Sequence, residues 1–495
     1  MSSSTAAINF SPVQRKLHHA SLGISCKSTA IISGLVLFLF YTLLYNNPYN
    51  HSSHLLMSFV EHKSPATATA TSLGITNSPT NISHIMFVLV GSNRTWKYKR
   101  SYIEAWWREN ITRGNIWLDE PPTEDLLPWP STSPTFQVNE DITKLKVYPK
   151  LVNPVMVRIY RSILDTFRLG ENKDVRWYVM ADDDTLFFVD NLVEVLGKYD
   201  HSKYHYIGTN SESIKSNYDF SFEMGYGGAG YALSYALVEE LVSKIDGCIE
   251  RYPHLWVSDY LSYSCLADLG VDLTIEKGLH QIDLRGDISG LLSSHQNSPI
   301  LTLHHFDEVE PIFPSKDRSE SVKHLMKAAK FDQSRVLQQT ICYDRQSNWT
   351  FSISWGYSAH VYESIFPRSI LRRPLETFMP WKKGRPPLLM FNTRWPSGDP
   401  CEAPHVYFLE NVDQSSEQSD RVVSVYTRKS ARNMGACSLN GNHSADPISR
   451  IQVSSPAIGR KEAGRIECCD VEYESGKEAA RVKLRACMKG EMLAY

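Results

Sequence analysis

The sequence carries almost no net charge. Its 495 residues contain 52 Lys and Arg against 54 Asp and Glu, which gives a formal net charge of −2 at pH 7. No global electrostatic field therefore favours nucleic acid or an anionic membrane surface, and no nucleic-acid partner is expected. Affinity for an anionic ligand would have to come from a local site.

Several common motifs are missing as well. The nine cysteines include no C-x-x-C pair of the kind that holds structural zinc. The G-x-x-x-x-G-K-S/T phosphate loop is also absent. No internal repeat is evident. These absences argue against a zinc module, a P-loop enzyme and a repeat protein.

One long uncharged apolar run is present, at residues 28–45. As a helix it would span roughly 27 Å, enough for a thin bilayer. Arg15, Lys16 and Lys27 precede it, and the next charges lie well downstream. The positive-inside rule then predicts a cytosolic tail at 1–27, a transmembrane signal anchor and a lumenal remainder. The protein is expected to be a single-pass type II protein of the Golgi membrane.

Three other interpretations of this run compete with a signal anchor. A cleaved signal peptide would need a small-residue cleavage site, which Tyr45-Asn-Asn-Pro48 does not offer. A transit segment is suggested only by the serines and threonine at the N-terminus. A buried core helix is disfavoured because the flanking sequence has the composition of disorder.

Processing signals agree with a lumenal location. Eight of the nine cysteines follow the predicted anchor, an even number compatible with disulfides in an oxidising compartment. Cys248 and Cys265 are a plausible local pair, and free buried thiols are the alternative. A glycoprotein is predicted from N-x-S/T sequons, which begin at Asn50, Asn81, Asn93, Asn110, Asn348 and Asn442.

The composition divides the lumenal part into three regions. Residues 46–83 are rich in Ser, Thr, Asn and Pro and are predicted to form a flexible stem. Buried-strand patterns alternate with amphipathic helices over residues 84–315, which predicts an α/β layer fold with a mostly parallel sheet. Residues 316–495 form a C-terminal extension containing β-strands, either a separate module or strands packed on the core.

The strongest motif follows a buried strand at residues 176–180. Tyr178-Val-Met-Ala is followed by Asp182, Asp183 and Asp184. Three adjacent carboxylates repel one another unless solvent, a cation or hydrogen bonds compensate them. Oxygen ligands at alternate positions of an extended segment suit Mg²⁺ or Mn²⁺ carrying phosphates. A solvated acidic turn is the alternative, which the apolar residues on both sides disfavour.

A glycine-rich segment comes next. Tyr226-Gly-Gly-Ala-Gly-Tyr-Ala-Leu-Ser234 removes side chains from a loop just before a helix. Such a loop lets a ligand approach the backbone closely, and an ordinary tight turn is an equally good interpretation.

Two further segments carry candidate polar residues. His304 and His305 emerge from the apolar stretch Leu301-Thr-Leu303, where a histidine could complete a metal site or simply pack in the core. Asp259 stands before a helical segment, where it could be a general base or a helix N-cap.

Together these segments resemble the fringe-type glycosyltransferases, glycosyltransferase family 31, and most closely the plant fringe-related proteins classed as a domain of unknown function. The resemblance covers roughly residues 84–410. It includes Leu337-Gln-Gln-Thr-Ile-Cys-Tyr-Asp344, Ser354-Trp-Gly-Tyr357 and Phe391-Asn-Thr-Arg394, which are similar to the plant group in particular.

The resemblance implies a GT-A fold and an inverting transfer from a UDP-sugar to a glycan or glycoconjugate, usually through a β-1,3 link. It implies Asp182, Asp184 and His305 as ligands of Mn²⁺ or Mg²⁺, with His304 as the fallback, and Asp259 as the base. Donor-binding residues would be Asp182, Asp183, Ser92, Arg100, Gly227, Gly228 and Gly230.

One departure leaves an alternative open. Fringe-like members commonly present two acids where this chain has Asp259-Tyr260. A catalytically weak or inactive relative that binds a nucleotide sugar or a glycan is therefore the second hypothesis. A structural adhesion protein, in which the aspartates are dispensable, is the third. The identity of the sugar and of the acceptor does not follow from the sequence.

Overall fold

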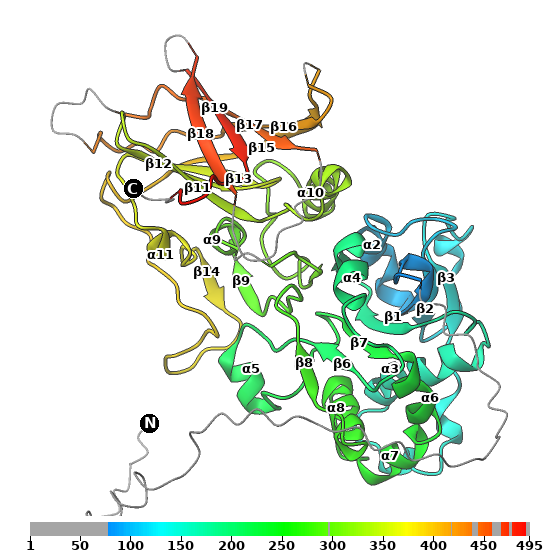
Figure 1. Cartoon of the computed structure of the whole chain (residues 1–495). Helices are drawn as coiled ribbons and strands as arrows, with labels where there is room; N and C mark the ends of the chain where they lie inside the picture. The colour runs from blue at the N-terminus through cyan, green and yellow to red at the C-terminus, as the bar shows by residue number, and fades with distance from the viewer. Residues whose placement is uncertain are drawn as a thin grey trace, which may run out of the picture. The chain divides into compact units, whose positions relative to one another are not determined.

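The structure is a computed structural model that describes residues 78–295, 298–416, 418–437, 444–457, 467–474 and 478–491 (Figure 1). The predicted tail, the anchor at 28–45 and most of the stem lie outside these residues. No helix within the described part is both long enough and apolar enough to cross a bilayer. Residues 77–495 form one compact unit.

A seven-stranded mixed sheet forms the N-terminal half of this unit. Its strand order is β3-β2-β1-β4-β7-β6-β8, and β3, β2, β1 and β4 run parallel. Strand β7 is antiparallel to both of its neighbours. The strands are β1 (Ile85–Val90), β2 (Arg113–Leu118), β3 (Thr135–Val138), β4 (Trp177–Asp182), β6 (Tyr206–Gly208), β7 (Tyr231–Ser234) and β8 (Leu273–Ile275).

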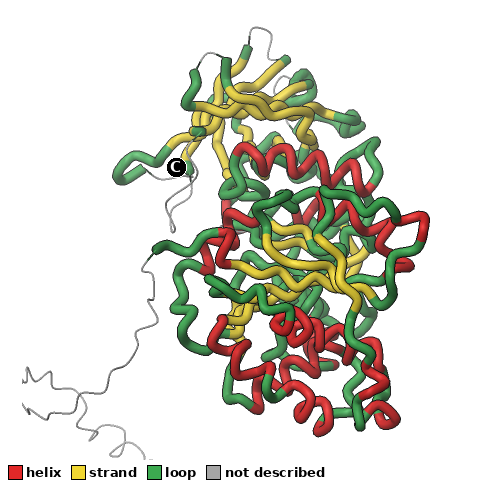
Figure 2. Tube along the Cα trace, turned by 90° about the vertical axis from the view of Figure 1, so that its right-hand side faces the viewer, coloured by secondary structure: helices red, strands yellow, loops and turns green. Residues whose placement is uncertain are grey.

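Helices cover both faces of this sheet (Figure 2). Strand β1 is the uninterrupted apolar run IMFVLV, and all six of its residues are buried. Alternate β1 side chains pack on opposite faces: one set belongs to the same buried cluster as side chains of α2 and α4, and the other to the cluster with side chains of α3, α6, α7 and α8. These helices are α2 (Asn93–Glu104), α3 (Pro154–Arg168), α4 (Val189–Leu196), α6 (Tyr235–Val242), α7 (Ile245–Arg251) and α8 (Ser258–Asp268).

Local chemistry explains where α3 begins, and a disulfide joins two other helices. Pro154 occupies the first turn of α3, where its missing N–H costs no intrahelical bond. The Cys248–Cys265 disulfide joins α7 to α8, which confirms the local pairing expected from the sequence.

The C-terminal half contains an eight-stranded sheet with the order β11-β12-β13-β15-β16-β17-β19-β18. Neighbouring strands are antiparallel except β17 and β19. The sheet is rolled, because the Cys342–Cys469 disulfide joins its two outermost strands. The strands are β11 (Gln339–Asp344), β12 (Trp349–Ser354), β13 (Ser358–Tyr362), β15 (His405–Gln414), β16 (Arg421–Arg428), β17 (Arg450–Pro456), β18 (Cys468–Tyr473) and β19 (Ala479–Arg485).

The two sheets share one hydrophobic core. A single cluster of buried side chains runs from β1 and α2 through α10 (Arg318–Phe331) to β12, β15 and β19. Of the two arrangements left open by the sequence, the extension is therefore a set of strands packed on the core.

A segment of the C-terminal extension, residues 378–391, returns to the first half and is called the strap below. Its strand β14 (Phe378–Pro380) pairs with β9 (Leu284–Gly286). Further along, the Ile214 N–H donates to the Leu388 carbonyl, and the Met390 N–H donates to the Glu212 carbonyl. The strap therefore lies beside α5 (Ile214–Asp219).

Shorter elements complete the described chain. They are β5 (Leu186–Phe187), β10 (Thr302–Leu303), α9 (Ser289–Leu292), α11 (Arg368–Leu371), and the 3-10 turns η1 (Ile82–His84), η2 (Glu124–Leu126), η3 (Ile142–Lys144) and η4 (Tyr148–Lys150).

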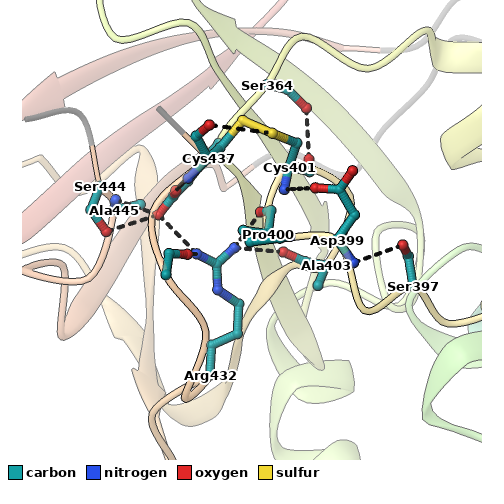
Figure 3. The surroundings of a disulfide bond; sticks show 12 residues. Ser364, Ser397, Asp399, Pro400, Cys401, Ala403, Arg432, Cys437, Ser444 and Ala445 are labelled. Carbon is teal, nitrogen blue, oxygen red and sulfur yellow. Dashed lines mark hydrogen bonds and ion pairs between the residues drawn. A yellow bond between two sulfur atoms is a disulfide. The ribbon is translucent and has the colours of Figure 1, made fainter. Parts of the chain in front are cut away.

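A buried carboxylate organises the loops at one end of the rolled sheet. Glu363 accepts hydrogen bonds from His405 Nε2 at 2.9 Å and from the Cys437 N–H at 2.7 Å, and it lies 3.2 Å from Arg432. Figure 3 shows Arg432 donating to the carbonyls of Pro400 and Ala403 beside the Cys401–Cys437 disulfide. Glu363, Arg432 and the Cys401–Cys437 disulfide therefore hold the same loops together.

These contacts predict an acid-sensitive contribution to stability. Burial alone would raise the pKa of Glu363, but the hydrogen bonds from His405 and the backbone N–H groups lower it from 4.5 to about 2. The stabilisation is therefore complete above pH 4.5 and is lost as the pH falls towards 2. Glu363→Gln should lower the free energy of unfolding by about 3 kcal/mol at pH 7, measured by denaturant titration.

The control is Glu474→Gln, because Glu474 pairs with Arg481 at the surface. The Glu474→Gln substitution should lower the free energy of unfolding by less than about 1 kcal/mol. The difference in free energy of unfolding between the Glu363→Gln variant and the wild type should be smaller at pH 3 than at pH 7. A difference that is equal at pH 7 and pH 3 would contradict this account.

Candidate functional site

The carboxyl ends of three parallel strands meet at one edge of the first sheet. Val90 at the end of β1 is in register with Trp117 of β2 and with Asp182 of β4. The residues that follow each strand therefore lie close together, as expected for a ligand site in an open α/β sheet.

A cleft of about 370 Å³ opens at this edge. The acidic triplet forms part of its wall, together with residues from α2, α3, the segment after β10 and the strap. Its lining residues are Val90, Gly91, Ser92, Thr95, Lys99, Val155, Arg158, Ile159, Asp182, Asp183, Asp184, His304, His305, Asp307, Glu308 and Trp381.

Two aspartates and one histidine form a group that can hold a metal ion. Ligand atoms of Asp182, Asp184 and His304 all lie within 4.8 Å of one another. His304 Nε2 is 3.2 Å from Asp184 Oδ1 and 3.6 Å from Asp182 Oδ2. Two carboxylates and one imidazole are a donor set that fits Mn²⁺, and Mg²⁺ with additional water ligands.

His305, the ligand preferred from the sequence resemblance, is not in this group. Its backbone has a φ of 59°, which folds its ring against that of His304 at 3.8 Å between centroids. Its Nδ1 lies 3.3 Å from Asp283 Oδ1, and its other face stacks on Trp381 at 4.7 Å. The imidazole beside the carboxylates is therefore that of His304.

A lysine neutralises part of the charge of the triplet. Lys99 Nζ lies 3.1 Å from Asp184 Oδ2, 3.4 Å from Asp183 Oδ1 and 3.3 Å from Asp307 Oδ2. Asp184 thus directs one oxygen to Lys99 and the other to His304. Asp183 packs under Gly91 and lies 3.5 Å from the Thr95 hydroxyl, so it faces the end of β1.

These ion pairs separate the protonation behaviour of the carboxylates. Burial alone would raise the pKa of Asp184, but His304 and Lys99 hold that pKa well below its usual range. Burial and the neighbouring Asp184 charge raise the pKa of Asp183 to about 7. Burial lowers the pKa of His304, but Asp184 outweighs it and raises that pKa to about 9.

Asp259 lies in the first turn of α8, and its carboxylate reaches the glycine-rich segment. A Cβ on Gly227 would lie 2.5 Å from Asp259 Oδ1. Burial and the charge of Asp182 raise the pKa of Asp259 to about 7. A carboxylate with this pKa is suited to accept a proton near neutral pH.

The next glycine makes room for the histidine. A Cβ on Gly228 would lie 2.1 Å from His304 Cε1. Gly230 has a φ of +81° and forms the turn into β7. Gly227 thus makes room for Asp259 and Gly228 for His304, while Gly230 forms a tight turn, the second interpretation that the sequence left open; none of the three lines the described cleft.

Tyr260 does not replace the missing second acid. Its ring stacks on Tyr263 and contacts Phe220, at 6.1 and 6.0 Å between centroids. Asp259 is therefore the acid that α8 contributes here.

Two nucleotide-binding candidates from the first strand end have different positions. Ser92 lines the cleft, caps α2 and donates a 2.9 Å hydrogen bond to Asp119. Arg100 does not line the described cleft, and the neighbouring Lys99 is the α2 cation that does.

Sequence reasoning assigned no role to Lys99, Arg158 and Trp381, which line the cleft, or to Asp119, which accepts the hydrogen bond of Ser92. Asp119 directly follows β2, so its position after a buried strand was an available signal. Arg158 donates to the Gly91 carbonyl at 3.2 Å from α3. No local pattern marks Arg158 or Trp381, because only the packing of α3 and the strap brings them to the cleft.

The contacts of Gly227 and Gly228 predict that a substitution at each glycine displaces a different side chain. Gly228→Ala should displace His304 and weaken Mn²⁺ binding at least about tenfold, measured by calorimetry, since one of three ligands moves. Gly227→Ala should displace Asp259 and leave Mn²⁺ affinity within about twofold of the wild type. Gly398→Ala is the control, because no atom lies within 4 Å of its added Cβ. Equal Mn²⁺ affinity in the Gly228 variant and the wild type would refute the arrangement.

Solved structures that match this chain include three glycosyltransferases, each at about a tenth identity. A mannosyltransferase of Pyrobaculum calidifontis with GDP-mannose and Mn²⁺ is 10% identical, with a TM-score of 0.26, and covers 51% of this chain and 65% of its own. The match thus spans less than two thirds of that enzyme.

The other two matches are also glycosyltransferases of low sequence identity. Core-mannan synthase A of Aspergillus fumigatus, in its Mn/GDP form, is 10% identical with a TM-score of 0.21, and covers 46% of this chain and 80% of its own. Mouse xyloside xylosyltransferase 1, in its apo form, is 9% identical with a TM-score of 0.25, and covers 42% of this chain and 85% of its own.

Comparison of sequences gives a family. No curated protein matches this chain. A family model described as "Protein of unknown function, DUF604" matches residues 216–469. The match includes the glycine-rich segment, Asp259, His304 and the strap, and begins after the acidic triplet. Since it spans half of the sequence, the chain belongs to the DUF604 family.

Proposed function

We propose that this protein is a metal-dependent glycosyltransferase with a GT-A-type fold. The observation that carries the proposal is the convergence of Asp182, Asp184 and His304 on a cleft at the carboxyl ends of parallel strands. A carboxylate and imidazole site in that position suits a divalent cation carrying a diphosphate. The fringe-like resemblance extends the proposal to a UDP-sugar donor and an inverting transfer that forms a β-1,3 link.

The donor site is assigned from the cleft lining. Asp182, Asp184 and His304 would hold Mn²⁺ or Mg²⁺. A metal bound there would supply positive charge that stabilises the leaving diphosphate. Lys99 and Arg158 line the same cleft and offer further positive charge for phosphate oxygens.

The polar groups at the strand ends suit the nucleoside. Asp119 already accepts hydrogen bonds from the Ser92 hydroxyl and the Asn93 N–H, so its position is fixed. Its carboxylate would accept a further hydrogen bond from a ribose hydroxyl. Val155 and Ile159 give the cleft an apolar side against which a base can pack.

Asp259 is assigned as the general base. It accepts the proton of the acceptor hydroxyl while that oxygen attacks the anomeric carbon and the bond from that carbon to the diphosphate breaks. Its carboxylate lies beside Gly227, and the charges of Asp182 and His304 are close enough to act on its pKa. The orientation of Tyr260 towards other aromatic rings leaves Asp259 as the single acid for this step.

The cellular setting is proposed from the sequence alone. A type II anchor at residues 28–45 and a stem would place the catalytic unit in the Golgi lumen. The four disulfides of the described chain, together with the sequons, support an oxidising compartment.

Two substitutions test the enzyme. Asp184→Ala should abolish metal-dependent release of UDP from a panel of UDP-sugars, because the Asp184 carboxylate leaves the ligand group. Asp259→Asn should lower the rate of transfer at least about a thousandfold and leave UDP and Mn²⁺ affinity unchanged, since only the proton acceptor is lost. UDP release with an acceptor panel and calorimetry measure the two effects.

EDTA treatment should abolish release, and Mn²⁺ should restore it. Metal-dependent donor binding without turnover in the wild type would instead support the catalytically silent binding protein. Undiminished activity in the Asp184→Ala variant would refute both the assignment of Asp184 as a metal ligand and the proposed metal-dependent function.

A further inference from the structure

Three buried side chains hold the backbone of the glycine-rich segment, and the proposed function assigns a role to none of them. The Thr185 hydroxyl donates to the Gly228 carbonyl at 2.8 Å. The Gln281 side-chain oxygen accepts from the Ala229 N–H at 2.7 Å, and the Thr302 hydroxyl donates to the Ala229 carbonyl. Because these hydrogen bonds are buried, they fix the segment more firmly than exposed ones would.

Two of the three side chains come from segments that carry the proposed metal ligands. Thr185 directly follows Asp184, and Thr302 lies on β10 two residues before His304. Their hydroxyls therefore bond the glycine-rich segment to both parts of the metal group. Gln281 belongs instead to the loop between β8 and β9, which supplies neither a proposed ligand nor the proposed base.

The residue after Gln281 has a backbone conformation that few side chains adopt. Ile282 is fully buried and has a φ of 50°, in the left-handed region that disfavours a β-branched residue. Glu212 accepts a hydrogen bond from the Ile282 N–H at 2.7 Å, and its other oxygen lies 3.0 Å from His280 Nδ1. The surroundings thus hold a conformation that Ile282 itself opposes, which is common near functional sites.

The left-handed residue Ile282 separates two polar side chains that reach different parts of the site. Gln281 bonds to the glycine-rich segment, whereas Asp283 lies 3.3 Å from His305 Nδ1. Residues 280–283 therefore contact the surroundings of the metal group at two points, and they are called the support loop below.

The position of Ala229 matters because the two residues before it leave little room. A Cβ on Gly228 would lie 2.1 Å from His304, and a Cβ on Gly227 would lie 2.5 Å from Asp259. A displaced segment would therefore press on the imidazole, on the carboxylate, or on both. The same short backbone thus sets the places of a proposed metal ligand and of the proposed base.

We propose that Gln281 is a positioning residue, which holds the glycine-rich segment so that His304 and Asp259 keep their places. The inference rests on the proposed transferase function, and it gives the support loop a role in the reaction. Gln281 acts through the Ala229 N–H, and the backbone at Ile282 fixes the direction from which its side chain approaches.

The test compares Gln281→Met and Gln281→Glu with Gln339→Met in the full chain. Methionine is of similar length but lacks an oxygen acceptor, whereas glutamate keeps one for the Ala229 N–H. Gln339 is the matched control, because it is buried in the rolled sheet and its side chain donates to Ser352 Oγ and the Leu371 carbonyl.

Three quantities are measured for each variant: amide hydrogen exchange of residues 225–234, Mn²⁺ affinity by calorimetry, and the kinetics of UDP release. Gln281→Met should speed the exchange at least about tenfold, because the Ala229 N–H loses its acceptor. Its Mn²⁺ affinity should fall about tenfold, and its kcat at saturating Mn²⁺ at least about tenfold, with the donor KM within about twofold. Gln281→Glu and Gln339→Met should stay within about threefold of the wild type throughout.

Wild-type exchange or wild-type Mn²⁺ affinity in Gln281→Met overturns the proposal, as does an equal loss of Mn²⁺ affinity in Gln339→Met. If Gln281→Met does not fold, Gln281→Asn takes its place with the same expected losses, because it withdraws the amide by one methylene. A wild type that neither binds Mn²⁺ nor releases UDP overturns the proposed function itself, and the exchange of residues 225–234 then still reports whether Gln281 holds the segment.

Discussion

Three adjacent carboxylates leave the central strand β4, and the surrounding site is arranged to neutralise them. Asp184 is almost fully buried, yet one of its oxygens faces His304 and the other faces Lys99. Buried carboxylates without such partners would be strongly destabilising. The ion pairs therefore permit Asp184 to remain charged at the strand end, and the third partner of this balance, a divalent cation, follows from the proposed function.

This constraint explains the neighbouring backbone. His304 can approach the carboxylates because Gly228 has no side chain, and Asp259 can reach the same region because Gly227 has none. The glycine-rich segment is thus shaped by the side chains of Asp259 and His304. A motif that suggests ligand contact in a sequence can instead be required by contacts between residues distant along the chain.

The rolled C-terminal sheet contributes to the site through a single returning segment. Its own stability depends on the shared hydrophobic core, on the disulfide between its outermost strands and on the Glu363 contacts. Anchored in this way, the strap carries Trp381 to the cleft, where it packs on His305. The position of His305 is therefore linked to the extension. Both His305 and the strap lie far from the acidic triplet in the sequence.

The sequence by itself determined the local features. The buried run at 85–90, the amphipathic helix at 154–168 and the triplet after β4 were all predictable, because hydrophobic periodicity and turn residues act over a few positions. The pairing of Cys248 with Cys265 was also within reach, since only 17 residues separate them.

Only the tertiary structure decided which of the two histidines faces the carboxylates. His304 and His305 are adjacent and chemically identical, and the choice depends on a left-handed backbone at His305 and on Trp381 packing against its ring. The roles of Lys99 and Arg158 were likewise undetermined, because their helices reach the cleft through core packing that leaves no local pattern. Local periodicity specifies elements, whereas a site depends on contacts between segments that the sequence keeps apart.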